Sequence, residues 1–222
     1  HNFPNLALME IAAYHKSKGD DVEWHNLFEK YDIVYQSKVF DDTYSQDFEY
    51  MPKAKKIIKG GTGYGLDNKL PDEIEHQYPD YSIYPILTKD TAYGYLTRGC
   101  PRGCHFCIVA TKEGRCSRKV ADLSEFWNDQ KFIKLLDPNI LACKEHLLLL
   151  QQLVDSKAYV DFTQGLDARL LTAENITLIN QIRLKEIHFA WDYMKEEKPV
   201  LRGLSLYKKY AKHKPHGHYG SV

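Results

Sequence analysis

Residues 97–114 read TRGCPRGCHFCIVATKEG and carry three cysteines close together. Cys100, Cys104 and Cys107 follow the pattern Cys-x3-Cys-x2-Cys, which suits a shared metal or metal cluster better than a disulfide framework. Thiolates are the soft ligands that hold iron–sulfur clusters, and the glycines and proline of this loop supply the turns that wrapping a cluster requires. Three protein ligands leave one iron of a four-iron cluster open, and an open position is typical of a catalytic site.

Zinc is the competing metal for these cysteines. A zinc site would need a fourth ligand, and the sequence offers His105 within the loop or Cys116 beyond it. Structural zinc sites, however, usually combine two pairs of Cys or Cys and His ligands. Cys116 and Cys143 have no partner at ligand spacing, so we interpret both as packing or incidental thiols.

The composition sets limits on the class of protein. The chain has 222 residues, of which 43% are hydrophobic, and this is enough for a packed core in one large or two small domains. Lys plus Arg and Asp plus Glu both number 30, so the balanced charge does not indicate a nucleic-acid partner. No run approaches the roughly 18 apolar residues of a membrane helix. Clustered reduced thiols favour the cytoplasm.

The first part of the chain alternates a helix with short strands. Apolar residues at helical spacing predict a helix over residues 6–18, and β-branched and aromatic runs predict strands over residues 21–24, 33–36 and 54–59. This alternation predicts a Rossmann-like α/β unit. Such units normally open with a strand, so we expect the first strand of this one to be missing from the chain.

A glycine-rich segment follows the last of these strands. Residues 60–65 read GGTGYG, which is compatible with either a sharp turn or a backbone contact to a phosphate or nucleotide. The dinucleotide fingerprint needs a helix directly after its glycines, whereas Leu70 and Pro71 intervene here. Residues 71–85 are rich in Pro and Tyr and form our predicted domain boundary, which gives domains of residues 1–85 and 86–222.

The alternation then resumes in the second domain. The pattern predicts strands over residues 92–97, 132–136, 159–163 and 186–191, and helices over residues 123–128, 144–156, 173–182 and 199–210. Four βα units in order predict a parallel sheet or a partial barrel. Residues 218–222 look like the approach to a fifth strand, so we expect this domain to be incomplete at its C-terminal end.

The cysteine loop resembles the signature of the radical S-adenosylmethionine (SAM) superfamily, in which an aromatic residue precedes the third cysteine. Phe106 fills that place. Residues 92–192 resemble the first four βα units of the family's partial (β/α)6 barrel, and residues 1–85 resemble the cobalamin-binding-type domain that precedes some of these barrels. The cobalt-ligating Asp-x-His-x-x-Gly loop is absent, so the sequence does not favour bound cobalamin.

The resemblance implies a cofactor set and a chemistry. The three cysteines would hold a 4Fe–4S cluster, SAM would chelate the fourth iron, and one electron would cleave SAM to a 5′-deoxyadenosyl radical. Phe106 would contact the adenine. An electron donor such as flavodoxin or ferredoxin is implied, while the substrate, small or macromolecular, is not identified. The alternatives are an iron–sulfur protein for electron transfer or sensing, and a zinc-binding, nucleic-acid-associated protein.

Polar residues follow the second and third predicted strands, at the edge where parallel barrels carry their sites. The family's second-strand motif for the SAM amino group is replaced here by residues 137–139, so the resemblance passes that role to Asp137 or Asn139. Gln164, Asp167 and Arg169 follow the third strand and are candidates for contacts with SAM or the substrate. Asp167 and Arg169 could equally pair with each other as a structural ion pair.

Other charged residues allow two interpretations each. Asp192 follows the fourth predicted strand as a candidate ligand or as a helix N-cap. The basic residues around the loop could neutralise a cluster or bind an anion; they are Arg98, Arg102, Arg115, Arg118 and Lys119. Near the C-terminal end, His213, His216 and His218 form a candidate metal clamp or a solvated loop, and the lysines at 208, 209, 212 and 214 form a basic run that could contact RNA.

Overall fold

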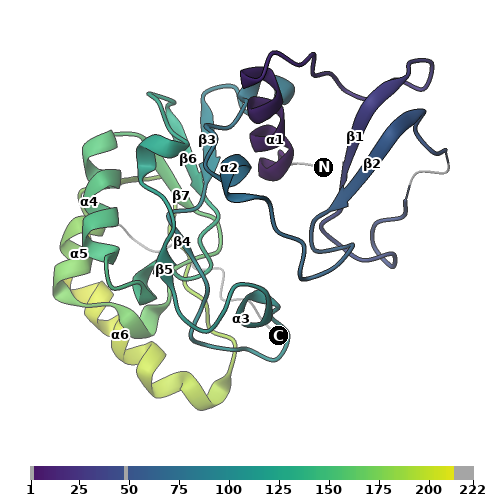
Figure 1. The fold of residues 1–222 in the computed structure, drawn as a ribbon. Coiled ribbons are helices and arrows are strands. Elements are labelled where there is room, and N and C mark those ends of the chain that lie inside the picture. The colour runs from purple at the N-terminus through teal and green to yellow at the C-terminus, as the bar shows by residue number, and fades with distance from the viewer. Residues whose placement is uncertain (1–2, 48–49, 213–222) are drawn as a thin grey trace. The chain divides into compact units, whose positions relative to one another are not determined.

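The computed structural model describes residues 3–47 and 50–212 (Figure 1). The chain divides into two compact units, His1–Lys89 and Asp90–Val222, which are described separately below. None of the helices in the described ranges is long and apolar enough to cross a membrane. The histidines predicted as a metal clamp, from His213 onward, lie outside the described residues.

The first unit is built on a pair of parallel strands. Strands β1 and β2 run in register, with Tyr31 opposite Ala54 and Ser37 opposite Gly60. Helix α1 begins after Asn5, whose side chain accepts a hydrogen bond from the Leu8 amide as an N-cap. The elements in order are α1 (Leu6–Ser17), β1 (Tyr31–Ser37), β2 (Ala54–Gly60), α2 (Asp72–Glu75) and η1 (Tyr81–Ile83).

The strand predicted over residues 21–24 is wrong, since this segment is irregular. Its side chains make hydrogen bonds to other segments of the unit instead. The Trp24 indole donates to the carbonyl oxygen of Ile83 at 2.9 Å, and the Tyr31 hydroxyl donates to the Glu23 carboxylate at 2.8 Å. A short strand forms only where a neighbouring strand can pair with its backbone. The contacts of Trp24 and Glu23 hold this segment away from such a neighbour.

The glycine-rich segment forms a tight turn against the chain that follows β1. The Gly63 amide donates to the carbonyl oxygen of Lys38 at 2.8 Å, and a Cβ atom on Gly61 would overlap that same oxygen. No helix follows directly, because α2 begins only at Asp72. These contacts explain the glycines as packing requirements of a turn, one of the two interpretations that the sequence left open.

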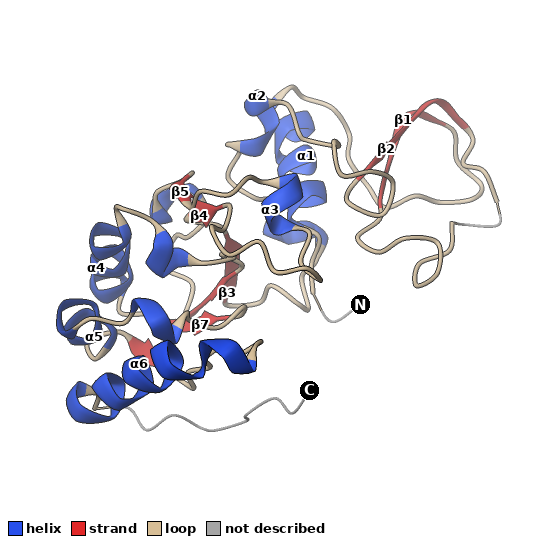
Figure 2. Cartoon of the chain, turned by 90° about the horizontal axis from the view of Figure 1, so that it is seen from below, coloured by secondary structure: helices blue, strands red, loops and turns tan. Residues whose placement is uncertain are grey.

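The second unit contains a four-stranded parallel sheet whose strand order follows the chain. The order is β3-β6-β7-β8, and each neighbouring pair is parallel. The helices α4, α5 and α6 lie along one side of this sheet (Figures 1 and 2). The fold is therefore α/β with parallel strands, as the sequence predicted. The strands are β3 (Thr91–Gly94), β6 (Phe132–Leu135), β7 (Tyr159–Phe162) and β8 (Arg183–Leu184), and the helices are α4 (His146–Ser156), α5 (Ala173–Ile179) and α6 (Glu197–Tyr210).

The two faces of this sheet differ in polarity. Ile133, Leu135 and Val160 point to one face and are at most 1% exposed. Lys134 and Asp161 alternate with them on the opposite face and are half-buried. Parallel sheets are usually apolar on both faces. We call this second face, on which Tyr93, Phe132 and Tyr159 lie beside the two charged residues, the polar face of the sheet.

Two predicted elements of the second unit are shorter than expected. The strand over residues 92–97 ends at Gly94, and residues Thr97–Arg98 instead form β4, which pairs antiparallel with β5 (Arg118–Lys119). The helix over residues 123–128 is only a 3-10 turn, η2 (Leu123–Glu125). The chain turns away soon after η2, because Asp129 adopts a left-handed conformation that ends any helix.

The predicted fourth strand is displaced along the chain. Strand β8 comprises Arg183–Leu184, and of residues 186–191 only Phe189 makes a bridge, to Leu166. The backbone of this segment instead pairs with Leu166, because the Leu166 amide donates to the carbonyl oxygen of His188 at 2.9 Å and the Ala190 amide donates to that of Leu166 at 3.3 Å. The predicted helices over residues 144–156, 173–182 and 199–210 correspond to α4, α5 and α6.

Gly203 provides a test of how α6 packs. A Cβ atom there would overlap the carbonyl oxygen of Ala168 in η4 (Ala168–Leu170). On helix propensity alone, Gly203→Ala would stabilise the fold by about 1 kcal/mol. Because of the overlap, we expect a loss of about 2 kcal/mol instead, measured by urea unfolding. Ser205→Ala on the exposed face of the same helix is the control, and equal stability of both variants would contradict the packing.

Candidate functional site

The cysteine loop is closed at its base by the β4–β5 pair. The Cys100 amide donates to the carbonyl oxygen of Gly114 at 3.1 Å, and the Gly99 amide donates to the Glu113 carboxylate at 3.0 Å. Gly99 has a φ of 86°, and a side chain there would overlap the carbonyl oxygen of Cys116. The sequence therefore needs glycine at this position so that the two ends of the loop can approach each other.

The three cysteines are free and half-buried within this loop. The Cys107 amide donates to the carbonyl oxygen of Cys104 at 3.0 Å, which folds that part of the loop into a turn. Burial raises the pKa of Cys104, and the nearby Asp192 carboxylate and the Cys100 and Cys107 thiols raise it further. The Cys104 sulfur thus lies within electrostatic range of the other two thiols, and the Arg169 charge offsets only part of the rise in its pKa.

The side chains do not surround a single point. Within residues 3–47 and 50–212, no three His, Cys, Asp or Glu side chains are grouped so as to hold one metal ion. The other two cysteines differ from the loop cysteines in environment. Cys116 is exposed, while Cys143 is buried and donates to Glu145 at 3.1 Å. Burial and this hydrogen bond raise the pKa of Cys143 to about 11, so its thiol is inert at neutral pH.

Asp137, a candidate for the SAM amino group, supports the start of the loop. One carboxylate oxygen accepts the Thr97 amide and the Thr97 hydroxyl, both at 2.6 Å, and the other accepts the Leu96 amide at 3.1 Å. The side chain is 5% exposed. Both oxygens are engaged by the chain between β3 and β4, so Asp137 fixes the point at which the chain leaves the sheet for the loop.

Asn139, the other candidate after β6, faces the cysteines. Its Nδ2 atom donates to the Cys100 sulfur at 3.7 Å and to an Asp167 carboxylate oxygen at 3.1 Å. The residue is 6% exposed, and its Oδ1 atom is buried with no hydrogen-bond partner among the described residues. A buried acceptor without a donor is costly, which marks this atom as a candidate contact for a ligand.

Asp167 joins the loop to the sheet. Its buried carboxylate accepts Arg102 Nε at 2.7 Å and a two-point contact from Arg169, with Nε at 2.6 Å and Nη2 at 3.0 Å. Although burial raises the pKa of Asp167, the hydrogen bonds and charges of Arg169 and Arg102 outweigh that effect and hold it below its usual value. Arg169 also pairs with Glu196. Asp167 and Arg169 do therefore pair, as one interpretation of the sequence held.

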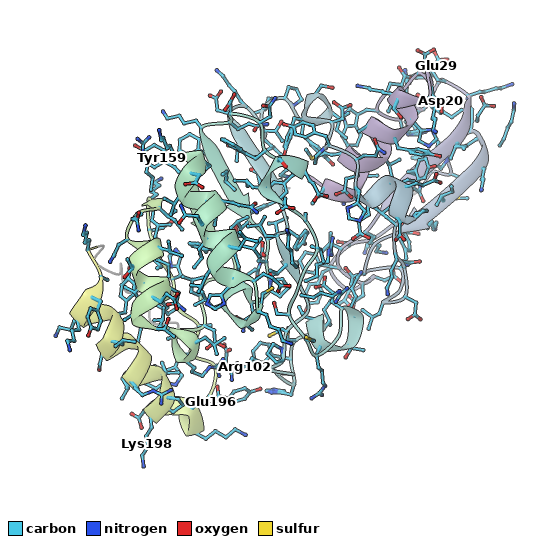
Figure 3. All side chains as sticks on the ribbon, turned by 60° about the vertical axis from the view of Figure 1, so that its left-hand side comes forward. Asp20, Glu29, Arg102, Tyr159, Glu196 and Lys198 are labelled. Atoms are coloured by element: carbon cyan, nitrogen blue, oxygen red, sulfur yellow. The ribbon has the colours of Figure 1, made fainter. Side chains whose placement is uncertain are left out.

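The network lies at the carboxyl edge of the sheet. Figure 3 shows Tyr159, the first residue of β7, at the end of the sheet opposite to Arg102, while Arg102 and Glu196 lie near each other beside the start of α6. Residues from three separate loops thus meet where the strands end. This is the edge at which parallel α/β proteins hold their ligands.

The remaining candidates lie at the surface of the same region. Phe106 is 61% exposed, and its ring lies 6.3 Å from that of Tyr193. Gln164 is exposed in the turn after β7. Asp192 is exposed as well and acts on the Cys104 thiol. Its interpretation as a helix N-cap is wrong, because Glu196 precedes α6.

Two residues of the candidate site, Tyr193 and Thr163, were not selected from the sequence. Tyr193 accepts or donates through its hydroxyl to His105 Nδ1 at 2.6 Å, which joins the cysteine loop to the segment before α6. Thr163, at the end of β7, has a buried hydroxyl without a partner among the described residues. The only available signal for Thr163 was its position directly after a strand. Nothing in the sequence pairs residues as distant as 105 and 193.

Comparisons with known proteins found no match: no protein-family model, curated protein or solved structure is significantly similar to this chain.

The buried Asp137 predicts a pH dependence of stability. Burial raises its pKa to about 6, although the hydrogen bonds from Thr97 and Leu96 lower it. A carboxyl with a higher pKa in the folded chain stabilises the fold most below its unfolded pKa near 4, and this contribution falls as the pH rises toward 6. Relative to Asp137→Asn, we expect the wild type to lose up to about 1.4 kcal/mol per pH unit between pH 4 and 6 in urea unfolding. A pH-independent difference between the two proteins would contradict this.

We predict that the Arg102–Asp167 ion pair restrains the motion of the cysteine loop. Arg102→Met keeps the aliphatic stem but removes the charge, so the loop loses its ion pair with Asp167. We expect amide hydrogen exchange over residues 100–107 to accelerate about tenfold, measured by mass spectrometry. Lys119→Met, which removes an ion pair with Asp122 at the base of the loop, is the matched control. Unchanged exchange in Arg102→Met would mean that the pair does not hold the loop.

Proposed function

We propose that this protein is a radical SAM enzyme that binds a 4Fe–4S cluster through Cys100, Cys104 and Cys107. The observation that carries the proposal is the position of the thiols. One loop with three free cysteines at this spacing is tied by Arg102 and Asn139 to the carboxyl edge of a parallel sheet. The strand order, identical with the chain order, supports a partial barrel as the finer description of this unit.

The donor set fits such a cluster better than it fits one zinc ion. In a cubane each thiolate binds a different iron, so the three sulfur atoms need to lie around one face of the cluster rather than around a point. Arg169 acts to lower the pKa of Cys104, and it thereby offsets part of the negative charge that three thiolates bring. His105, the alternative fourth ligand for zinc, bonds Tyr193 through Nδ1 and keeps Nε2 available, so this hydrogen bond does not separate the two metals.

Each residue of the site then has a definite task. When bound, the cluster supplies the electron that cleaves SAM to the 5′-deoxyadenosyl radical. Asp167 holds Arg102 and thereby fixes the loop, while Asp137 fixes the point where the loop leaves the sheet. The buried Asn139 Oδ1 and Thr163 Oγ1 atoms are acceptors for donors of the bound ligand. Phe106 lies at the open side of the loop, where an adenine can stack or pair with its backbone.

The polar face of the sheet supports an enclosed reaction space. Lys134 and Asp161 point away from the apolar core that the helices cover, on the face that would line the inside of a barrel. A radical must be shielded from solvent and yet reach its substrate, and an inward-facing polar surface provides groups for orienting a substrate. The identity of that substrate stays open.

The three ligand cysteines can be tested individually. After anaerobic reconstitution with iron and sulfide, we expect Cys100→Ala, Cys104→Ala and Cys107→Ala to lose the cluster. The proposed cluster needs all three thiolates, and the loop contains no further cysteine to replace one of them. Cys116→Ala and Cys143→Ala are the matched controls and should retain it. The measurements are iron and sulfide content and the visible absorption spectrum. Retained iron in Cys104→Ala would contradict the assignment.

Reduction of the reconstituted protein with SAM present tests the chemistry itself. Formation of 5′-deoxyadenosine that depends on the three cysteines is the expected result. A cluster that forms without this product would favour the alternative of an iron–sulfur protein for electron transfer or sensing. Zinc in place of iron would contradict the proposed function.

A further inference from the structure

Asn139 is held rigidly against a cluster ligand. Its amide nitrogen contacts the Cys100 sulfur at 3.7 Å and Asp167 at 3.1 Å, and its backbone carbonyl accepts the Ser117 hydroxyl at 2.9 Å. We infer that Asn139 is a positioning residue that donates an N–H hydrogen bond to the Cys100 thiolate and thereby sets the reduction potential of the bound cluster. This inference rests on the proposed function.

The orientation of the amide is determined by its neighbour. The Asp167 carboxylate can only accept hydrogen bonds while it is ionised, and its pKa is held low by two arginines. The NH2 group of Asn139 must therefore face Asp167, and its second N–H is the one directed at the Cys100 sulfur. A flipped amide would place two oxygen atoms against each other. The donor role of Asn139 toward Cys100 follows from this constraint.

The free oxygen of the same amide argues against a purely structural role. A buried asparagine that serves packing normally satisfies both ends of its amide, as Asn175 does in the capping box of α5. In Asn139 the nitrogen is fully used, whereas Oδ1 is buried without a partner among the described residues. The side chain is arranged around its contacts with Cys100 and Asp167, and its oxygen is left for a group that the chain does not supply.

The effect on the cluster follows from electrostatics. Reduction adds an electron, so the sulfur ligands of the reduced cluster carry more negative charge and accept hydrogen bonds more strongly. An N–H directed at sulfur therefore stabilises the reduced state, and this raises the potential. Burial strengthens the interaction because the local dielectric constant is low.

The test compares Asn139→Leu with Ser117→Ala in reconstituted protein. Leucine keeps the size of the side chain and removes the N–H donor, whereas Ser117→Ala removes only the hydrogen bond to the Asn139 backbone. We expect Asn139→Leu to keep its iron and to shift the redox equilibrium about tenfold against the reduced cluster, which is about 59 mV more negative for a one-electron couple. Ser117→Ala should match the wild type. The readout is a potentiometric titration followed by electron paramagnetic resonance.

A second measurement covers the case in which Asn139→Leu fails to hold a cluster. In wild-type protein labelled with ¹⁵N-asparagine, the reduced cluster should show a hyperfine coupling to an asparagine side-chain nitrogen, because none other than Asn139 in the described ranges contacts a loop cysteine. An unchanged potential in Asn139→Leu, or no ¹⁵N coupling in the wild type, would overturn the inference while leaving the proposed function intact. A wild type that binds no cluster would overturn both.

Discussion

The arrangement of the site depends on one buried carboxylate. Asp167 follows β7, yet its two oxygens receive Arg102 from the cysteine loop, Asn139 from the segment after β6, and Arg169 from its own 3-10 turn. Removing one partner of a buried ion pair leaves the other charge uncompensated, which is strongly destabilising, so each of these side chains requires the others. The loop has little secondary structure of its own, so the hydrogen bonds and ion pairs of Asp167 position it against the sheet.

Charge balance connects this network with the cysteines. Arg98 pairs with Glu113, and Arg102 and Arg169 pair with Asp167 and Glu196, so the charges of these six side chains balance. Three thiolates bring net negative charge into that environment, and the raised pKa of Cys104 expresses the same cost. Because these charges are already paired, oriented dipoles such as the Asn139 amide contribute to the stabilisation of the added charge.

The sequence predicted the elements that have a regular hydrophobic pattern, and it missed the features that depend on contacts between distant segments. Hydrophobic periodicity identified α1, α4, α5 and α6, as well as the strands β6 and β7, because each buries an apolar stripe or row within a few residues. The displaced fourth strand and the absent strand at residues 21–24 depend on which neighbour is available for pairing, and no local pattern contains that information. Gly203 lies within the predicted helix, but only the approach of η4 explains why it is glycine.

The residues of the candidate site also differ in whether local sequence or tertiary contacts determine their role. The three cysteines could be proposed as ligands from their spacing alone, since residues of one short loop come together without tertiary information. Asp137 and Asn139 could not be told apart from the sequence, because both are polar residues that follow the same predicted strand. The difference lies in direction: Asp137 turns back to the chain before the loop and spends both oxygens on it, whereas Asn139 turns toward Cys100 and keeps one buried oxygen unpaired. A residue with all its hydrogen bonds made inside the protein supports a site, and one with a buried atom still unpaired is a candidate to contact what the site binds.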